Sequence, residues 1–415
     1  MKLTKAEKSW ILYDIANSAF ILSVTATIPI YFRALAENAG VESNIVSAWW
    51  GTATSVAVVI LAIMAPILGA IADYKGMKKK LFVAFLAMGI LGAFSLAVTT
   101  DWMAFLLLFI IARVGYSACN IFYDSMLVDV STDERMDMIS SQGYAWGYVG
   151  STIPFIVGII LIFTKPFGIS TTQATQISFL ITAVWWGLLT IPMLKNVKQT
   201  YYLEPQPQVV SKAFSRVFLT LKKIFKNKKI FYYIVGYFCY IDGVYTIISM
   251  ATTYGGEVGI GTTEMIGALL LTQFVAFPFA ILAGILAKKH GALKLLKFYI
   301  LMYIGISIFG YQLDQAWEFW VLAIAVGMAQ GGIQSLSRSY FGKLVPKNES
   351  NEYFGFFDIF GKFADFFGPL ILAIMAVTTG SSRNGILALI ILFVIGYWML
   401  VKVEKLEKAE KASQQ

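Results

Sequence analysis

The sequence predicts an all-α membrane protein with twelve transmembrane helices in two similar six-helix bundles. Of its 415 residues, 58% are hydrophobic and only 14% are charged, which is more apolar surface than a soluble globular protein can bury. Twelve runs of about 18 to 25 mostly apolar residues are long enough to cross a hydrocarbon layer of roughly 30 Å. A segment with two glycines and a group of cations ends one such run and returns 215 residues later. Two related halves are therefore expected.

The expected helices follow the apolar runs in chain order. The first run begins at Trp10, and it is too long and too polar inside, with no small-residue cleavage pattern after it, to be a cleaved signal peptide. The expected helices are 10–32, 45–72, 81–99, 102–127, 142–164, 175–194, 230–253, 264–287, 295–313, 317–341, 353–377 and 385–401. The expected domains are an N-terminal bundle at 1–194, a cytoplasmic linker at 195–229, a C-terminal bundle at 230–402 and a cytoplasmic tail at 403–415.

The positive charges lie almost entirely on one side of the predicted helices. Of the 33 Lys and Arg residues, 28 fall in the two tails, the linker and the loops on that side, whereas Arg33, Lys165 and Arg383 fall on the other and Arg113 and Lys362 within the apolar runs. The positive-inside rule then predicts an integral protein of the cytoplasmic (inner) membrane with both termini in the cytoplasm. This placement explains the net charge of +9 without nucleic acid as a partner.

The linker contains a predicted amphipathic helix. Phe214, Val217 and Leu221 recur at helical spacing, and Lys222 and Lys223 belong to the basic residues that accompany them. Such a helix is typical of segments that lie on the anionic inner leaflet of a membrane. A solvated linker that carries some apolar residues is the alternative.

No residues point to a metal, a cofactor or an enzyme. Cys119 and Cys239 lie inside apolar helices, where a thiol behaves as a small hydrophobic group. His290 is the only histidine, and no Cys or acidic cluster accompanies it. The chain has no Walker loop and no pair of a nucleophile with histidine. We therefore expect a non-enzyme that binds no cofactor.

The first and seventh helices share a polar stripe at a constant offset of 228 residues. Steps of 4, 3 and 4 residues keep each stripe on one helical face, so matched stripes indicate a shared interior. The matching residues are Asp14, Ser18, Ile21 and Thr25 in the first helix and Asp242, Thr246, Ser249 and Thr253 in the seventh.

Other polar residues form faces within the apolar runs. A charged side chain at the bilayer centre costs at least ~2.5 to 3.5 kcal/mol, so such residues persist mainly where they face a cavity or a partner. In the eleventh helix a lysine between two acids is also consistent with a neutralised pair that only holds the helix in place. The faces are Arg113, Ser117, Asn120 and Asp124 in the fourth helix, Gln330 and Gln334 in the tenth, and Asp358, Lys362 and Asp365 in the eleventh.

Three of these charged residues have distinct expected roles. Asp242 lies about twelve residues inside its helix with no cation nearby in that helix, which makes it the strongest candidate for a carboxylate that binds and releases protons. Arg113 is the natural counter-charge for a carboxylate of the protein or of a ligand. Asp14 lies about one turn inside the cytoplasmic end, where capping the helix is the alternative to a role in transport.

The segment Gly69-Ala-Ile-Ala-Asp73-Tyr-Lys-Gly76-Met-Lys-Lys79-Lys80 resembles the signature between helices 2 and 3 of the major facilitator superfamily. The resemblance implies that Asp73 sits against the N-terminus of helix 11 near residues 351–354, where the helix dipole favours an anion. It implies further that Gly69 lets helices 2 and 11 approach, and that Gly69, Asp73, Gly76 and Lys79 form a latch that closes the cytoplasmic side. The second copy has Lys288 in place of the acid, so no equivalent latch is expected there.

Three further segments give a narrower resemblance. Residues 9–20 (SWILYDIANSAF), 330–341 (QGGIQSLSRSYF) and 353–357 (YFGFF) are similar to the fungal autophagy-related vacuolar amino-acid effluxers and their bacterial relatives. Asn17 belongs to the first of these segments. The antiporter signature of helix 5 is present only in part, as Gly150, Pro154 and Gly158.

The functional hypothesis is a secondary transporter that works by alternating access. Its central site would be lined by helices 1, 4, 7, 10 and 11, and buried charges of both signs favour an amphoteric solute such as an amino acid. Proton coupling, the direction of transport and the solute stay open. The alternatives are a drug or metabolite exporter of the same superfamily and a non-transporting receptor or scaffold on the same fold. The expected partners are a small-molecule substrate, the lipid bilayer and, if transport is coupled, protons, with the protein as a monomer.

Overall fold

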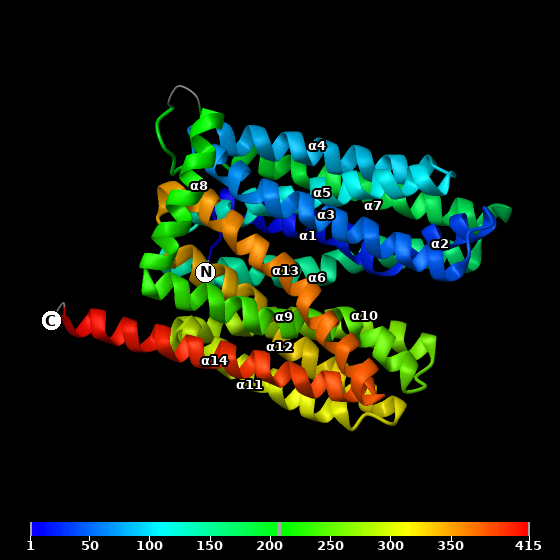
Figure 1. Cartoon of the computed structure of the whole chain (residues 1–415). Coiled ribbons are helices and arrows are strands. Elements are labelled where there is room, and N and C mark those ends of the chain that lie inside the picture. Colours follow the sequence, from blue (N-terminus) through cyan, green and yellow to red (C-terminus); the bar gives the residue numbers. More distant parts are fainter. Residues whose placement is uncertain (1, 206–208, 414–415) are drawn as a thin grey trace. The chain divides into compact units, whose positions relative to one another are not determined.

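The chain folds almost entirely into α-helices (Figure 1). The computed structural model describes residues 2–205 and 209–413, except for the side chains of residues 44, 209–212, 252–253, 262–263, 364–366, 373, 376 and 382. The helices are α1 (Lys5–Ala26), α2 (Ile28–Asn38), α3 (Ser43–Ala72), α4 (Met77–Val98), α5 (Trp102–Val130), α6 (Asp133–Thr164), α7 (Thr171–Asn196), α8 (Val209–Lys226), α9 (Lys228–Glu257), α10 (Thr262–His290), α11 (Ala292–Tyr311), α12 (Ala316–Leu344), α13 (Ser350–Thr379) and α14 (Ser382–Ser413), with 3-10 turns η1 (Pro166–Gly168) and η2 (Lys347–Glu349).

The number of helices that can span a membrane agrees with the predicted fold class. Within the described residues, eleven helices are long and apolar enough to cross a bilayer, and α1 with α2 passes the same test as one bent span, which gives up to twelve. The linker helix α8 is present and carries exposed phenylalanines, among them Phe214, Phe218 and Phe225. The predicted all-α fold with about twelve spans is confirmed.

The first expected helix, 10–32, is wrong as a single continuous helix. The chain bends by 42° between α1 and α2 at Thr27. Pro29 causes the break, because its nitrogen carries no hydrogen to donate to a carbonyl of the preceding turn, and a residue before proline is disfavoured in the helical conformation. The helix resumes when the amide of Tyr31 donates to the backbone oxygen of Thr27 at 3.0 Å.

The chain forms two compact units that do not coincide with the two sequence halves. Unit 1 contains residues 1–130, 146–213 and 348–355, and unit 2 contains residues 131–145, 214–347 and 356–415. Each unit therefore includes a short helical segment from the other half. The first turns of α6 belong to unit 2, and the first turns of α13 belong to unit 1.

Unit 1 is packed through glycines on α4 and α5. A Cβ atom on Gly89 would lie 2.5 Å from the ring of Trp186, which is fully buried and stacks on Phe20 with ring centres 5.4 Å apart. A Cβ atom on Gly115 of α5 would lie 2.5 Å from the nitrogen of Gly89. The three helices α4, α5 and α7 meet where only a hydrogen fits, as is common between membrane helices.

Unit 2 uses the same device between its own helix pairs. A Cβ atom on Gly331 of α12 would lie 2.6 Å from the Cβ of Ala280 on α10, and one on Gly396 of α14 would lie 2.9 Å from the Cβ of Tyr240 on α9. Close backbone contact maximises dispersion contacts where no hydrophobic effect drives helices together. The polar side chains described below are held on this rigid packing.

We expect Gly89→Ala to lower the thermal stability of the purified protein in detergent, by about 1 to 3 kcal/mol in the free energy of unfolding, because the new methyl group overpacks against Trp186. Gly305→Ala is the matched control, since Gly305 is exposed on α11 and a Cβ there meets no atom within 4 Å. That substitution should leave stability equal or slightly higher, because alanine favours a helix over glycine. Equal melting temperatures for the two variants would contradict this account of the packing.

Candidate functional site

A buried carboxylate joins two distant parts of the chain within unit 1. Asp73 directly follows α3 and is 1% exposed, and its Oδ1 accepts hydrogen bonds from the backbone amide and the side-chain amide of Asn351, both at 2.9 Å. Its Oδ2 accepts a further hydrogen bond from the backbone amide of Glu352 at 3.3 Å. The first amides of a helix have no partner within the helix, and the helix dipole favours an anion beside them. Asp73 therefore caps α13 from another helix.

The helix before Asp73 crosses the start of α13 at very short range. A Cβ atom on Gly69 would lie 2.4 Å from the backbone oxygen of Asn351, and one on Gly355 would lie 2.6 Å from the backbone oxygen of Ala65. Ser125 of α5 adds a hydrogen bond to Oδ1 of Asn351. Glycine is needed on both helices at this crossing, because a side chain on either would push the backbones apart.

The turn after Asp73 is fixed by the segment that follows α7. Gly76 has a φ of +75°, a conformation that favours glycine, and its amide donates to Oε1 of Gln199 at 2.9 Å. Lys79 donates to the backbone oxygen of Val197 at 3.4 Å. All four residues of the predicted latch thus lie around the α3–α4 turn, two of them against the start of α13 and two against the segment after α7.

Sequence reasoning missed a buried ion pair that supports this turn. The ammonium of Lys78 lies 2.5 Å from Oδ2 of Asp129, and both side chains are fully buried. Oδ1 of Asp129 accepts hydrogen bonds from the backbone amides of Thr200 at 2.7 Å and Tyr201 at 3.0 Å. The sequence assigns Lys78 only to the positive charge of the cytoplasmic side, and the expected fourth helix, 102–127, ends before Asp129. The sequence did contain a signal for this ion pair, because Asp129 lies just beyond an apolar run on the same predicted side as the four basic residues of 73–80.

The predicted polar faces of the first and fourth helices meet in unit 1. Asn17 of α1 donates from Nδ2 to Oδ1 of Asn120 on α5 at 2.9 Å. Asp14, Asn17 and Ser117 are buried, and Asn120 and Asp124 are partly buried. The two faces therefore form one polar seam between α1 and α5.

Arg113 lies one turn before Ser117 on the same face of α5. Its side chain is partly exposed, but Nη1 is buried and has no hydrogen-bond partner among the described residues. A buried guanidinium nitrogen without an acceptor is costly, which is why such groups are usually satisfied by an acceptor or a ligand. The arrangement can accept an anionic group at this position.

Asp242 of α9 is fully buried in unit 2 and contacts α13 beside the proline within that helix. Its Oδ1 accepts a hydrogen bond from the backbone amide of Gly368 at 2.8 Å, and Thr246 donates to its backbone oxygen at 2.7 Å. Pro369 follows, so the amide of the next residue is absent and the helix is weakened at this point. A Cβ atom on Gly368 would lie only 1.6 Å from Oγ1 of Thr246. Only glycine permits this contact.

The same relation recurs at the repeated position in unit 1. A Cβ atom on Gly147 of α6 would lie 3.0 Å from Oγ of Ser18 and 3.3 Å from the backbone oxygen of Asp14. Ser18 and Thr246 are the equivalent residues of the 228-residue repeat. In both units a glycine therefore lies against the hydroxyl residue one turn after the acid.

The remaining predicted residues of unit 2 lie on α12 and α13. Gln330 and Gln334 of α12 are buried, and Asp358 and Lys362 of α13 are partly buried. The side chain of Asp365 lies outside the described residues, so the predicted trio of α13 is seen only in part.

A second polar cluster in unit 2 was not predicted. Asp137 of α6 accepts hydrogen bonds from Ser339 at 2.7 Å and from Lys343 at 2.6 Å. Arg338 donates from Nε to Oγ of Ser140 at 3.0 Å and from Nη2 to the backbone oxygen of Ser140 at 3.1 Å. The guanidinium also lies 4.3 Å from the ring centre of Tyr144. These contacts bind the first turns of α6 to the end of α12.

The repeated signature explains why this cluster occurs where it does. A Cβ atom on Gly284 would lie 2.8 Å from the Cβ of Ser141 on α6. At Gly284, α10 therefore crosses α6 at short range, as α3 crosses α13 at Gly69. Lys288, which replaces the acid of the first copy, is exposed. The charged contacts at this crossing come instead from Asp137 and Arg338. Arg338 lies within the segment 330–341, which gave part of the family resemblance, but the sequence does not indicate Ser140 of α6 as its partner.

The described residues contain no group of three or more His, Cys, Asp or Glu side chains that could hold a metal ion. The polar groups of the two units are carboxylates, amides, hydroxyls and cations on packed helices. This chemistry suits reversible binding of a small polar solute.

The fold is that of solved major facilitator transporters. The chain aligns with the human organic anion transporter MFSD10 (TETRAN) at a TM-score of 0.74 and 12% identity, covering 95% of this chain and 99% of that one. It aligns with the transporter FucP in the outward conformation at a TM-score of 0.72 and 13% identity, covering 96% and 97%. At these identities the likeness shows the fold alone. The predicted major facilitator fold is confirmed.

Sequence comparison identifies the family. The model of the vacuole effluxer Atg22-like family matches residues 4–136 and 128–413, and the chain belongs to this family. The MFS-type transporter YxiO of Bacillus subtilis (strain 168) is 43% identical over 420 residues, which cover 100% of this chain and 98% of that protein. Autophagy-related protein 22 of Yarrowia lipolytica (strain CLIB 122 / E 150) is 24% identical over 312 residues, 66% of this chain and 52% of that protein. The predicted resemblance to the vacuolar effluxers and their bacterial relatives is confirmed, and the protein is a transporter of the major facilitator type.

We expect Asp73→Asn to speed amide hydrogen exchange in the segment 348–355 by about ten- to a hundredfold, because hydrogen bonds to a charged acceptor are worth roughly 1.5 to 3 kcal/mol. Hydrogen exchange with mass spectrometry on protein in lipid nanodiscs measures this. Asp101→Asn is the control, since Asp101 is exposed and its carboxylate accepts a hydrogen bond from the amide of Ala104 rather than from α13. Unchanged exchange in 348–355 would show that Asp73 does not hold the start of α13.

Arg338→Lys should have the complementary effect on the first turns of α6. Lysine keeps the charge but loses the two-point contact with Ser140 and the flat contact with Tyr144, so exchange in 133–145 should rise about tenfold. The segment 348–355 belongs to the other unit and should keep its wild-type exchange, as 133–145 should in the Asp73 variant. A rise in both segments would mean general unfolding and would refute two separate contacts.

Proposed function

We propose that the protein is a secondary transporter that moves an amino acid or a related amphoteric metabolite by alternating access. The single observation that carries this proposal is a pair of polar stations on packed helices, each within one unit. One station centres on the cation Arg113 and the other on the anion Asp242. The description of the matched family as vacuole effluxers supports transport of a small solute.

In unit 1, Arg113 would bind the carboxylate of the solute. Its Nη1 is buried without a hydrogen-bond partner among the described residues, and a planar guanidinium matches the geometry of a carboxylate. The neighbouring seam of Asn17, Ser117 and Asn120 would supply neutral donors and acceptors beside it. Asp14 and Asp124, which lie together at the end of this antiparallel seam away from Arg113, would disfavour a second negative charge.

In unit 2, Asp242 would be the carboxylate that binds protons if transport is coupled. Its charged form accepts the amide of Gly368 in a charge-assisted hydrogen bond, which is roughly twice as strong as a neutral one. Protonation would weaken this contact beside Pro369, where α13 is already weakened. Proton binding would thereby be linked to bending of α13. Thr246, Gln330, Gln334, Asp358, Lys362 and Asp365 would complete the polar lining of this unit.

The two clamps would restrain the conformational change. Asp73 holds the start of α13 in unit 1, and Arg338 with Asp137 holds the start of α6 in unit 2. Each clamp ties a short segment of one sequence half to helices of the other half, so both must open when the halves separate on that side. This supports the role of Gly69, Asp73, Gly76 and Lys79 as a latch and extends it with a second contact.

We place the protein in the cytoplasmic membrane with both termini in the cytoplasm. The distribution of 28 of its 33 basic residues supports this orientation. Under it, both clamps lie on the cytoplasmic side, and the exposed phenylalanines of α8 would rest on the anionic inner leaflet.

The decisive experiment is counterflow of a labelled amino-acid mixture into proteoliposomes, with and without an imposed proton gradient. Asp242→Asn should keep exchange and lose the response to protons. Arg113→Ala should raise the concentration for half-maximal exchange about ten- to a hundredfold, because one charged hydrogen-bonded contact to the solute is lost.

Two matched controls separate these roles from general charge effects. Asp101→Asn and Lys165→Ala remove exposed charges outside the two stations and should leave exchange unchanged. Normal transport by both Arg113→Ala and Asp242→Asn would refute the stations. Correctly inserted wild-type protein that exchanges no amino acid and no other solute of a broad panel would refute transport of this class.

A further inference from the structure

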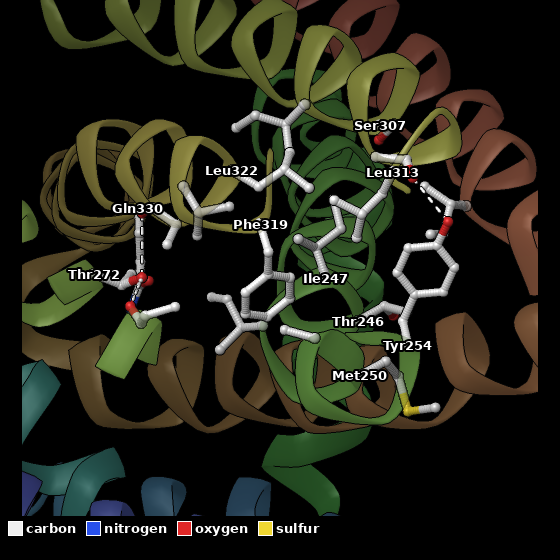
Figure 2. Close-up of a pocket in the computed structure, with 18 of the residues that line it drawn as sticks. Thr246, Ile247, Met250, Tyr254, Thr272, Ser307, Leu313, Phe319, Leu322 and Gln330 are labelled. Atoms are coloured by element: carbon white, nitrogen blue, oxygen red, sulfur yellow. Dashed lines mark hydrogen bonds between the residues drawn. The ribbon is translucent and has the colours of Figure 1, made fainter. Parts of the chain in front are cut away.

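Unit 2 contains a partly open cavity of about 100 Å³ near the loops that join α9 to α10 and α11 to α12 (Figure 2). Residues of six helices, α9 to α14, line it, and most of them are apolar. Figure 2 shows Gln330 and Tyr254 on opposite sides of the space. The apolar wall includes Ile247, Leu313, Phe319, Leu322, Leu372 and Leu389.

The hydroxyl groups around this cavity already donate to backbone oxygens. Thr246 donates to Asp242 at 2.7 Å, and Ser307 donates to Tyr303 at 2.9 Å. The phenol of Tyr254 donates to Gly310 at 2.8 Å. Thr272 also donates to backbone oxygens, those of Ala268 at 2.9 Å and Ala323 at 3.2 Å. These hydroxyls are therefore left only as acceptors toward an occupant.

Gln330 adds a buried amide to this lining. It is 5% exposed, and its Oε1 is buried with no hydrogen-bond partner among the described residues. An amide oxygen without a partner in an apolar space costs free energy, which a donor from a bound molecule would recover. Among the described residues that line the cavity there is no Asp, Glu, Lys or Arg, so a charged ligand would find no compensating charge from them. The chemistry favours a neutral molecule.

We propose that this cavity is a binding site for a small, neutral, mostly apolar molecule that carries one hydrogen-bond donor, of the size and class of a phenol. The donor would meet Oε1 of Gln330, and the ring would occupy the apolar wall. A wholly apolar cavity of about 150 Å³ is known to take up benzene, so a single ring is the right order of size. The cavity shares Thr246 and Gln330 with the polar lining proposed for transport, and binding of a neutral probe can be measured there with no transported solute present.

The ligand would also stabilise the contact between α9 and α13. It would touch Thr246, which packs on Gly368, and Leu372, which lies one turn beyond it. Binding in this cavity thus favours the conformation in which Asp242 accepts the amide of Gly368. A molecule bound here would act as a modulator of α13.

Fluorine NMR of 4-fluorophenol and fluorobenzene tests the site with the full-length protein in nanodiscs, and empty nanodiscs measure partition into lipid. Both probes should bind the protein, and 4-fluorophenol should bind about three- to tenfold more tightly, which is the ratio expected for one net hydrogen bond. Gln330→Leu should abolish that preference and keep the binding of fluorobenzene. Gln273→Leu, which changes the other amide in the lining, should keep the preference.

Ala268→Leu and Ala323→Leu should fill the cavity and abolish binding of both probes, with folding checked by size-exclusion chromatography and circular dichroism. Wild-type protein that binds neither probe beyond empty nanodiscs would overturn the proposal, whether or not the filled variants fold. A preference that survives Gln330→Leu and is lost in Gln273→Leu would overturn the assignment of the acceptor.

Discussion

The structure depends on a buried carboxylate that accepts hydrogen bonds from the start of another helix. Asp73 is almost fully buried, so its charge is tolerable only while the first turn of α13 supplies donors. The carboxylate and the amides at the start of α13 therefore each depend on the other for hydrogen bonds. When the start of α13 leaves, the acid must be hydrated or find another partner, and the orphan amides of α13 must do the same. Such a contact is strong in one conformation and absent in another, as a conformational latch requires.

The second copy of the signature solves the same geometric problem with different chemistry. Gly284 keeps the close crossing, but the residue equivalent to the acid is an exposed lysine. An arginine of α12 that binds Ser140, and an acid of α6 that binds Lys343, supply the polar contacts instead. Both copies of the repeat thus have the close helix crossing, whereas the charged residues beside it differ between them. In the first clamp a carboxylate accepts hydrogen bonds from amide groups, whereas the second clamp includes an ion pair between Asp137 and Lys343. A change in ionic strength should therefore affect the two clamps differently.

The sequence predicted the fold well because its signals are local. Apolar runs, repeated glycines and the placement of cations each report on one segment, and twelve spans in two halves follow from them. Pro29 was a local signal too, and it accounts for the bend that the single first helix lacked. The contacts that define the site are of another kind. Asn351 for Asp73, Asp129 for Lys78 and Ser140 for Arg338 are partners separated by 278, 51 and 198 residues, and no spacing within a helix encodes them. The resemblance to a known superfamily supplied the first of these, and nothing supplied the others.

The repeat also shows why the proposed proton coupling would act through α13. In both units an acid of the first repeated helix is followed one turn later by a hydroxyl residue that lies against a glycine of another helix, Ser18 against Gly147 and Thr246 against Gly368. The spacing is looser at Gly147, where a methyl group would meet oxygen at 3.0 Å, than at Gly368, where it would meet oxygen at 1.6 Å. The tighter copy also has its carboxylate bonded to a main-chain amide beside a proline, so a change of charge acts directly on the backbone. One copy of the repeat therefore forms a packed seam of side chains, whereas in the other the carboxylate of Asp242 contacts the main chain of α13, which is the contact that the proposed proton coupling would use.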